Sequence, residues 1–143
     1  SRVNFKEVIK TAVAGRELVR AIGYVITTES GEEKPFLEAL NQIGIETKSK
    51  DLQIFPGGMK KADWDVGLTI DAVRFSSSFI NTIVIISGDG DFIPLVEYLK
   101  GKGIQVEVIS FGRSTSAKLK EAVDDFIDIG AEPKKYLMKI TNR

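Results

Sequence analysis

Cysteine and histidine are both absent from this 143-residue sequence. The absence of cysteine excludes disulfides, thiolate catalysis and zinc–sulfur sites. The absence of histidine excludes a Ser-His-Asp triad, an imidazole base and the commonest transition-metal ligand. Any catalysis must therefore rest on carboxylates, lysine, arginine, hydroxyls, backbone amides or a hard cation held by oxygen atoms.

The sequence also lacks a net charge and long apolar runs. Lys plus Arg and Asp plus Glu both number 20, so the charge balance indicates neither a nucleic-acid nor a membrane partner. No apolar run approaches the ~20 residues that span a bilayer. No secretory signal is visible either, so we expect a cytoplasmic protein without membrane contact. The chain opens with Ser1 rather than Met, so we expect its natural start to be missing.

The length fits one domain with a hydrophobic core. Strands predicted near 17–28, 45–52, 81–87, 104–109 and 126–129 alternate with helices predicted near 4–13, 36–43, 63–77, 92–100, 116–122 and 132–140. This alternation predicts an α/β fold with a mostly parallel sheet.

Three of these segments carry more specific expectations. The β-branched run Thr82 to Ile86 predicts a central strand buried on both faces. Ile104 to Ile109 alternates apolar and polar residues and predicts an outer strand. The helix at 63–77 is apolar nearly all round, so it is expected to be largely buried.

Carboxylates gather in two places. Asp89 and Asp91 flank a glycine directly after the central strand, where ligands of open α/β sheets bind. Asp65 and Asp71 lie on the preceding helix, and Asp71 shares a face with apolar residues. A buried carboxylate must be paired, for instance with Arg74, or hold a cation. Clustered carboxylates without imidazole suit Mg²⁺ or Mn²⁺.

Each of these acids also has a purely structural interpretation. Asp65 and Asp91 stand where helix caps are common, and Asp89 fits a turn. EF-hand, dinucleotide-binding and Walker motifs are incomplete. A phosphatase or receiver-like phospho-acceptor is a third functional class. It would need a nucleophilic aspartate at the end of a first strand, and this chain has none there.

Two motifs at their spacing resemble the NYN domain family of PIN-like ribonucleases, in particular its LabA-like branch. They are Lys61-Ala-Asp-Trp-Asp65-Val-Gly-Leu-Thr-Ile-Asp71 and Ser87-Gly-Asp89-Gly-Asp91-Phe92. The likeness covers most of residues 17–130. It implies a three-layer Rossmann-like PIN-type fold with a mostly parallel central sheet flanked by helices, in the strand order 3-2-1-4-5. It also implies a divalent-metal-dependent ribonuclease.

The resemblance carries site residues with it. It assigns catalysis to Asp65, Asp71, Asp89 and Asp91, and binding of Mg²⁺ or Mn²⁺ to Asp71, Asp89 and Asp91. We expect Ser87, Lys61 and Arg113 to bind the RNA substrate, single-stranded or structured. The alternative is a non-catalytic nucleic-acid-binding or regulatory module with the same fold, and a homodimer is an open option.

One departure from the family affects the sheet. The family begins with a central strand that ends in an aspartate, whereas this chain starts at the helix that should follow that strand. We therefore expect the first strand to be missing, the strand at 82–86 to have one unpaired edge, and the metal site to be one ligand short. An N-terminally incomplete NYN/PIN-like domain is expected over 1–131 and a C-terminal helical extension over 132–143.

Overall fold

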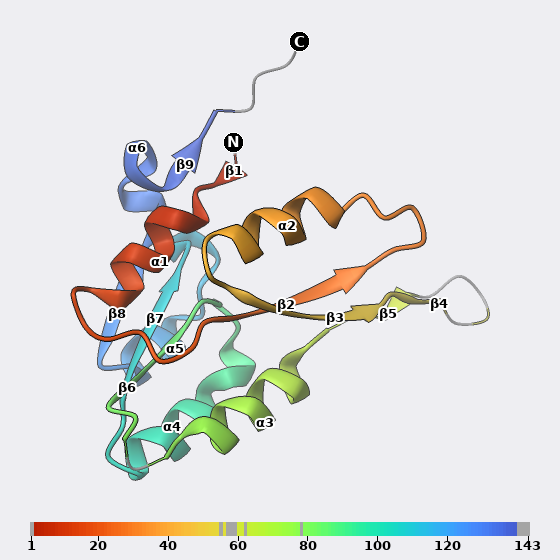
Figure 1. Cartoon of the computed structure of the whole chain (residues 1–143). Coiled ribbons are helices and arrows are strands. Elements are labelled where there is room, and N and C mark those ends of the chain that lie inside the picture. The colour runs from red at the N-terminus through yellow and green to blue at the C-terminus, as the bar shows by residue number, and fades with distance from the viewer. Residues whose placement is uncertain (1, 55, 57–59, 62, 78, 140–143) are drawn as a thin grey trace. The chain divides into compact units, whose positions relative to one another are not determined.

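The computed structural model describes residues 2–54, 56, 60–61, 63–77 and 79–139 (Figure 1). The chain divides into two compact units. Unit 1 combines Ser1–Gly15 with Thr69–Arg143, and unit 2 is Arg16–Leu68.

The sheet of unit 1 consists of three parallel strands. They are β6 (Thr82–Ile85), β7 (Gln105–Ser110) and β8 (Asp125–Asp128), in the order β6-β7-β8. The strand β7 lies in the middle, with Val106 and Val108 fully buried, so the prediction of an outer strand at 104–109 is wrong. The reason is that β8 pairs with the edge of β7 that faces away from β6. Among the described residues β6 pairs only with β7, which fits the expected unpaired edge but not a central position buried on both faces.

Helices pack around this sheet. Helix α4 (Ile93–Gly101) packs on β7 and buries Leu95, Val96 and Leu99, and α5 (Ala117–Ala122) lies beside α4. Helix α1 (Phe5–Val13) matches its predicted range, and Asn4 caps it: Asn4 Oδ1 accepts a hydrogen bond from the Glu7 amide at 3.4 Å. The core cluster that includes Val8 of α1 joins residues far apart in sequence: Val8, Ile109, Ile129 and Tyr136.

The C-terminal segment is part of unit 1. The short helix α6 (Pro133–Tyr136) leads into β9 (Leu137–Met138), which pairs antiparallel with β1 (Arg2–Val3) (Figure 1). The predicted helix at 132–140 therefore ends at Tyr136. The reason is that Tyr136 is buried in the core, with 1% of the residue exposed. This position directs the next residues toward β1, with which they pair. The expected division into a domain over 1–131 and an extension over 132–143 stays a prediction.

Unit 2 contains a smaller parallel sheet. It is formed by β2 (Ile22–Thr27) and β3 (Glu46–Asp51), and α2 (Lys34–Gln42) packs on β3. The strand predicted from residue 17 thus begins later, at Ile22. Two short strands were not predicted: β5 (Lys60–Lys61) pairs antiparallel with β4 (Gln53–Ile54).

Helix α3 (Asp65–Phe75) begins in unit 2 and continues in unit 1. Of its described side chains only Asp71 is buried, while Val66 and Ile70 are 71% and 53% exposed. The prediction of a largely buried helix is therefore wrong. Apolar residues point in all directions from α3, and packing covers only some of those directions.

The chain is thus α/β, with parallel sheets flanked by helices, as the sequence predicted. The strand order 3-2-1-4-5 predicts that the second and third strands pair and that the fourth and fifth pair. Both pairs are confirmed, as β2 with β3 in unit 2 and as β6 with β7 in unit 1. The single central sheet is not seen among the described residues, because no described strand pairs with the second edge of β2 or of β6. In the described part of the chain, no helix is both long and apolar enough to cross a bilayer.

Candidate metal centre

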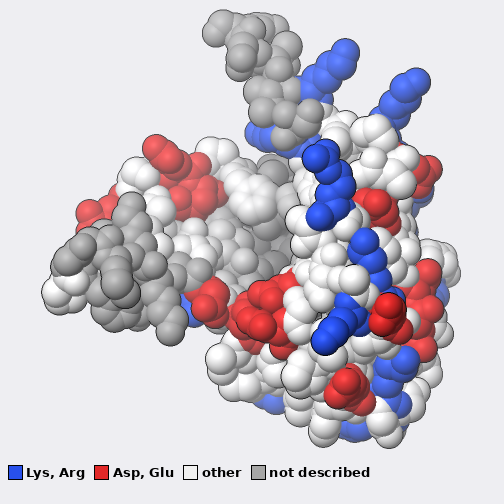
Figure 2. Space-filling view, turned by 180° about the vertical axis from the view of Figure 1, so that it is seen from behind, with Lys and Arg blue, Asp and Glu red and all other residues white. Residues whose placement is uncertain are grey.

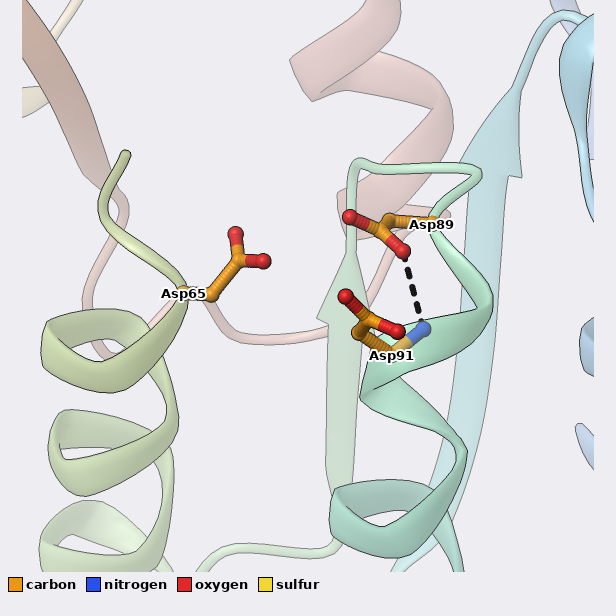
Figure 3. A group of neighbouring side chains, drawn as sticks. All are labelled: Asp65, Asp89 and Asp91. Carbon is orange, nitrogen blue, oxygen red and sulfur yellow. Dashed lines mark hydrogen bonds between the residues drawn. The ribbon is translucent and has the colours of Figure 1, made fainter. Parts of the chain in front are cut away.

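A short acidic turn follows β6. The Asp89 amide donates to Ser87 Oγ at 3.2 Å, and the Asp91 amide donates to Asp89 Oδ1 at 2.8 Å (Figure 3). Asp89 thereby caps the 3-10 helix η1 (Gly90–Phe92), which leads directly into α4. The Phe92 side chain is buried and anchors the turn, whereas both aspartates are exposed. The turn therefore presents two carboxylates to solvent, and the Asp91 amide holds that of Asp89.

The two glycines of this turn lie against a later segment of the chain. A Cβ at Gly88 would stand 2.7 Å from Thr115 Oγ1, and one at Gly90 would stand 3.0 Å from Ser116 Oγ. The Ser116 amide also donates to the Gly88 carbonyl at 3.0 Å. Thr115 and Ser116 thus support the acidic turn from behind. Neither residue was predicted to lie near the turn, although glycines alternating with the acids indicated a close neighbour.

The expected substrate-binding residues have different surroundings. Arg113 is exposed on the 3-10 helix η2 (Gly112–Ser114), which follows β7. The Ser87 hydroxyl is turned toward the Asp89 amide. Lys61 has its backbone in β5, and its side chain lies outside the described part of the structure. Their roles toward a substrate stay predictions.

Asp71 is buried, as its apolar neighbours predicted, with 6% of the residue exposed. Its Oδ1 lies 3.6 Å from Arg74 Nη1, the ion pair that the sequence offered as one explanation. Among the described residues, Asp71 does not join a group of three or more potential metal ligands. Its role as a cation ligand stays a prediction.

Asp65 is the first residue of α3, where a carboxylate is favoured by the exposed amides of the helix end (Figure 3). Its own amide donates to Asp63 Oδ1 at 3.1 Å, so Asp63 provides the local cap. Asp65, Asp89 and Asp91 each offer a carboxylate oxygen of the kind that a hard cation binds.

A further aspartate at this sheet edge has a structural role that was not predicted from the sequence. Asp128 ends β8, and its Oδ1 accepts hydrogen bonds from the amides of Gly112 and Gly130, both at 2.8 Å. The Gly112 amide is the main cause that holds the pKa of Asp128 below its ordinary value, and the Gly130 amide and Lys120 act in the same direction against desolvation. An aspartate directly after an apolar strand and two residues before a glycine was the available signal.

Comparison with known proteins places the chain among its relatives. The sequence pattern of the NYN domain matches residues 1–130. "Low amplitude and bright protein LabA" of Synechococcus elongatus is 29% identical over 119 residues, which are 79% of this chain and 63% of that protein. The chain therefore spans less than two thirds of the length of this curated relative.

A solved structure is similar over most of the chain. It is the crystal structure of a protein of unknown function from Vibrio parahaemolyticus, with a TM-score of 0.81 and 31% identity over 90% of this chain and 80% of that one. This likeness agrees with the α/β fold described above. The match of residues 1–130 to the NYN domain confirms the resemblance seen in the two acidic motifs, and this chain belongs to the NYN domain family.

Proposed function

We propose that this protein is a divalent-metal-dependent ribonuclease that hydrolyses RNA phosphodiester bonds. The observation that carries the proposal is the acidic turn after a parallel strand, where Asp89 and Asp91 are exposed and their amides donate to Ser87 Oγ and Asp89 Oδ1. Ligands of open α/β sheets bind at this edge. Membership of the NYN family supports the same conclusion, because the resemblance implies an acidic metal site.

The donor atoms fit a hard cation. The candidate ligands are all carboxylates, and neither imidazole nor thiolate exists in the chain, which suits Mg²⁺ or Mn²⁺. We assign metal binding to Asp89, Asp91 and Asp71, with Asp65 as a fourth acid that takes part in catalysis. When bound, such a cation polarises a phosphoryl oxygen of the substrate.

The residues around the acids have supporting roles in this proposal. Arg113 and Lys61 neutralise phosphate oxygens of the RNA, Arg113 through two parallel N–H groups of its guanidinium. The Ser87 hydroxyl holds the Asp89 amide and so fixes the start of the turn. Contacts of this kind hold the backbone of RNA without reading its sequence.

A non-catalytic nucleic-acid-binding module is the second candidate, and one observation favours it. Arg74 already pairs with the buried Asp71, so that carboxylate has a positive partner without any metal ion. If this second candidate is right, the acidic turn and the residues around it bind RNA but do not hydrolyse it.

The test measures cleavage of single-stranded RNA with Mn²⁺, with Mg²⁺ and with chelator. Wild-type protein is compared with Asp89→Asn and with the control Asp125→Asn. The control removes an equal charge from an exposed aspartate at the start of β8, the opposite edge of the same sheet. We expect metal-dependent cleavage by wild type and by Asp125→Asn, and its loss in Asp89→Asn.

Other outcomes separate the alternatives. Cleavage that survives Asp89→Asn indicates a contaminating nuclease and contradicts the proposed site. RNA binding without cleavage in any metal supports the binding module. If the protein neither binds nor cleaves RNA, both candidate functions are excluded.

A further inference from the structure

The parallel sheet of unit 1 arranges three connections in a row. Because β6, β7 and β8 are parallel and adjacent, the segments that follow them leave from the same edge. The acidic turn follows β6, η2 with Arg113 follows β7, and the 3-10 helix η3 (Ile129–Ala131) with α6 follows β8. Neighbouring strands are ~4.8 Å apart, so the first and third of these connections start roughly 10 Å from each other.

Contacts between these connections hold the row together. The η2 and η3 helices lie side by side, and Asp128 joins them through the Gly112 and Gly130 amides. The helix α5, directly after η2, lies beside η1 of the acidic turn. The order from the acids to α6 is therefore a property of unit 1 alone.

Beyond the acidic turn, the connections 111–120 and 128–139 hold six basic residues and two acidic ones, Asp128 and Glu132, although the whole chain has no net charge. The segments 111–120 and 133–139 contain no Asp or Glu. Their basic residues are Arg113, Lys118, Lys120, Lys134, Lys135 and Lys139. Basic side chains project at the end of unit 1 that carries α6 and β9, at the top of Figure 2. We call this set the basic row.

Most cations of the basic row are available to a ligand. Arg113, Lys118, Lys134 and Lys135 are exposed, and within the described part of the chain their side chains make no hydrogen bond or ion pair. Lys135 Nζ does lie 5.2 Å from the centre of the Tyr136 ring. Two lysines elsewhere in unit 1 are engaged: Lys100 Nζ donates to the Ala122 carbonyl at 2.9 Å and Lys102 Nζ to the Ser76 carbonyl at 2.7 Å. Lys6 and Lys10 of α1 are exposed, as most cations of the basic row are. Lys120 of the row is likewise engaged, with the Gly112 carbonyl at 2.8 Å.

We infer that the basic row binds the phosphate backbone of an RNA strand whose reacting phosphate lies at the acidic turn, with Arg113 and then Lys134 and Lys135 contacting successive flanking phosphates. The inference rests on the proposed function and adds to it a path for the substrate. The order of the acidic turn, then Arg113 on η2, then α6 along one sheet edge fits the path of one phosphate chain. An anionic membrane would instead favour a broad basic face.

The test measures RNA affinity by fluorescence anisotropy in chelator, which prevents metal-dependent cleavage. The probes are labelled oligoribonucleotides of about 4 and about 16 nucleotides, the range of site sizes for single-strand grooves. The variant K134Q/K135Q is compared with the control K100Q/K102Q. The control removes the same two charges near the C-terminal end of α4 (Ile93–Gly101), just before β7 begins, and thus at the opposite sheet edge.

We expect K134Q/K135Q to weaken binding of the longer RNA several-fold and to leave the shorter RNA nearly unaffected. The slope of log affinity against log salt should fall by about 1.4, because each lost phosphate contact contributes ~0.7 for a single strand. The control should bind both probes as wild type does. Melting temperatures of both variants show that the comparison is made on folded protein.

Unchanged binding by K134Q/K135Q, or equal losses in both variants, overturns the inference. A third probe is a vesicle containing anionic phospholipid. Vesicle binding that is lost in K134Q/K135Q while RNA affinity persists also overturns the inference and assigns the row to a lipid surface. Wild type that neither binds nor cleaves RNA defeats the proposed function and the inference together. Wild type that cleaves RNA while K134Q/K135Q binds normally defeats the inference alone.

Discussion

Gly90 lies between the two exposed aspartates, and a Cβ at this position would stand 3.0 Å from Ser116 Oγ and 3.2 Å from Ser116 Cβ. Such distances are shorter than ordinary van der Waals contact, so a side chain at position 90 requires the turn or Ser116 to shift by a few tenths of an ångström. The carboxylates of Asp89 and Asp91 would move with the turn. The position of these acids therefore depends on a residue 26 positions along the chain from Gly90.

We predict that Gly90→Ala weakens Mn²⁺ binding several-fold, measured by titration with detection of free Mn²⁺ by electron paramagnetic resonance. Adding Ser116→Gly should restore much of the affinity, because it removes the atoms in conflict. Glycine replaces serine as an N-cap at a cost of only a few tenths of a kcal/mol. The control is Gly101→Ala, where a Cβ meets nothing within 4 Å. Full Mn²⁺ affinity in Gly90→Ala would show that the turn tolerates displacement.

Asp128 acts on stability rather than on the proposed chemistry. Its pKa is lowered, chiefly by the Gly112 amide, so the ionised form stabilises the folded state. This contribution is fully present above the unfolded pKa near 3.9 and is lost as the pH falls through the lower folded pKa.

We predict that Asp128→Asn lowers the free energy of unfolding at neutral pH. The difference from wild type should remain constant down to about pH 5 and shrink below about pH 4. Urea unfolding at a series of pH values measures it. A difference that grows on acidification would contradict the assigned direction of the pKa shift.

Among the elements, β7 contributes most to the core of unit 1. It pairs on both edges, and Val106, Val108 and Ile109 have no exposed surface. Its place in the sheet could not be predicted from its alternating pattern. The flanking residues Gln105 and Glu107 suggested a half-solvated strand, but the pairing of β8 covers the second edge, and Glu107 is buried with a hydrogen bond from Gln105 at 2.7 Å.

We predict that Ile109→Ala destabilises the protein by about 2–5 kcal/mol, because it leaves a cavity beside Val8, Ile129 and Tyr136. The more conservative Ile109→Val should cost about 0.5–1.5 kcal/mol. Chemical denaturation measures both. The control is Ile86→Ala, where 40% of the residue is already exposed. Equal losses at positions 86 and 109 would contradict the assignment of β7 to the core.

Helix boundaries illustrate how far local patterns reach. Helix α1 ends at Val13, as predicted, because its cap and periodicity are encoded within a few residues. The C-terminal helix ends at Tyr136, well short of the prediction. Its boundary depends on the hydrogen bond between the Tyr136 hydroxyl and Thr11 Oγ1 at 2.9 Å and on the pairing of β9 with β1, and both partners are distant in sequence.

At the scale of the whole molecule, the proposed cation should be linked to folding. A ligand that binds only the folded state stabilises it by about 2.7 kcal/mol at 100 times its Kd. We predict that saturating Mn²⁺ raises the Tm of wild type by several degrees relative to chelator, and that Asp89→Asn loses most of this shift. Differential scanning calorimetry measures it, with Ca²⁺-free buffer and the Asp125→Asn variant as controls. An equal shift in Asp89→Asn would place the cation elsewhere.

The sequence by itself determined the α/β class, most helix and strand positions, the family and the two acidic motifs. These features depend on local periodicity, on turn residues and on the types of residue present, all of which are readable without contacts. The burial of Asp71 was also predictable, because its helical neighbours are apolar.

Only the tertiary structure decided which strand lies in the middle of the sheet, that Arg74 pairs with Asp71, and that Thr115 and Ser116 support the acidic turn. It also ordered the acidic turn, η2 and α6 along one edge. The physical reason is the same in each case. These features are contacts between segments far apart in sequence, and they depend on strand pairing and side-chain packing that no local pattern encodes.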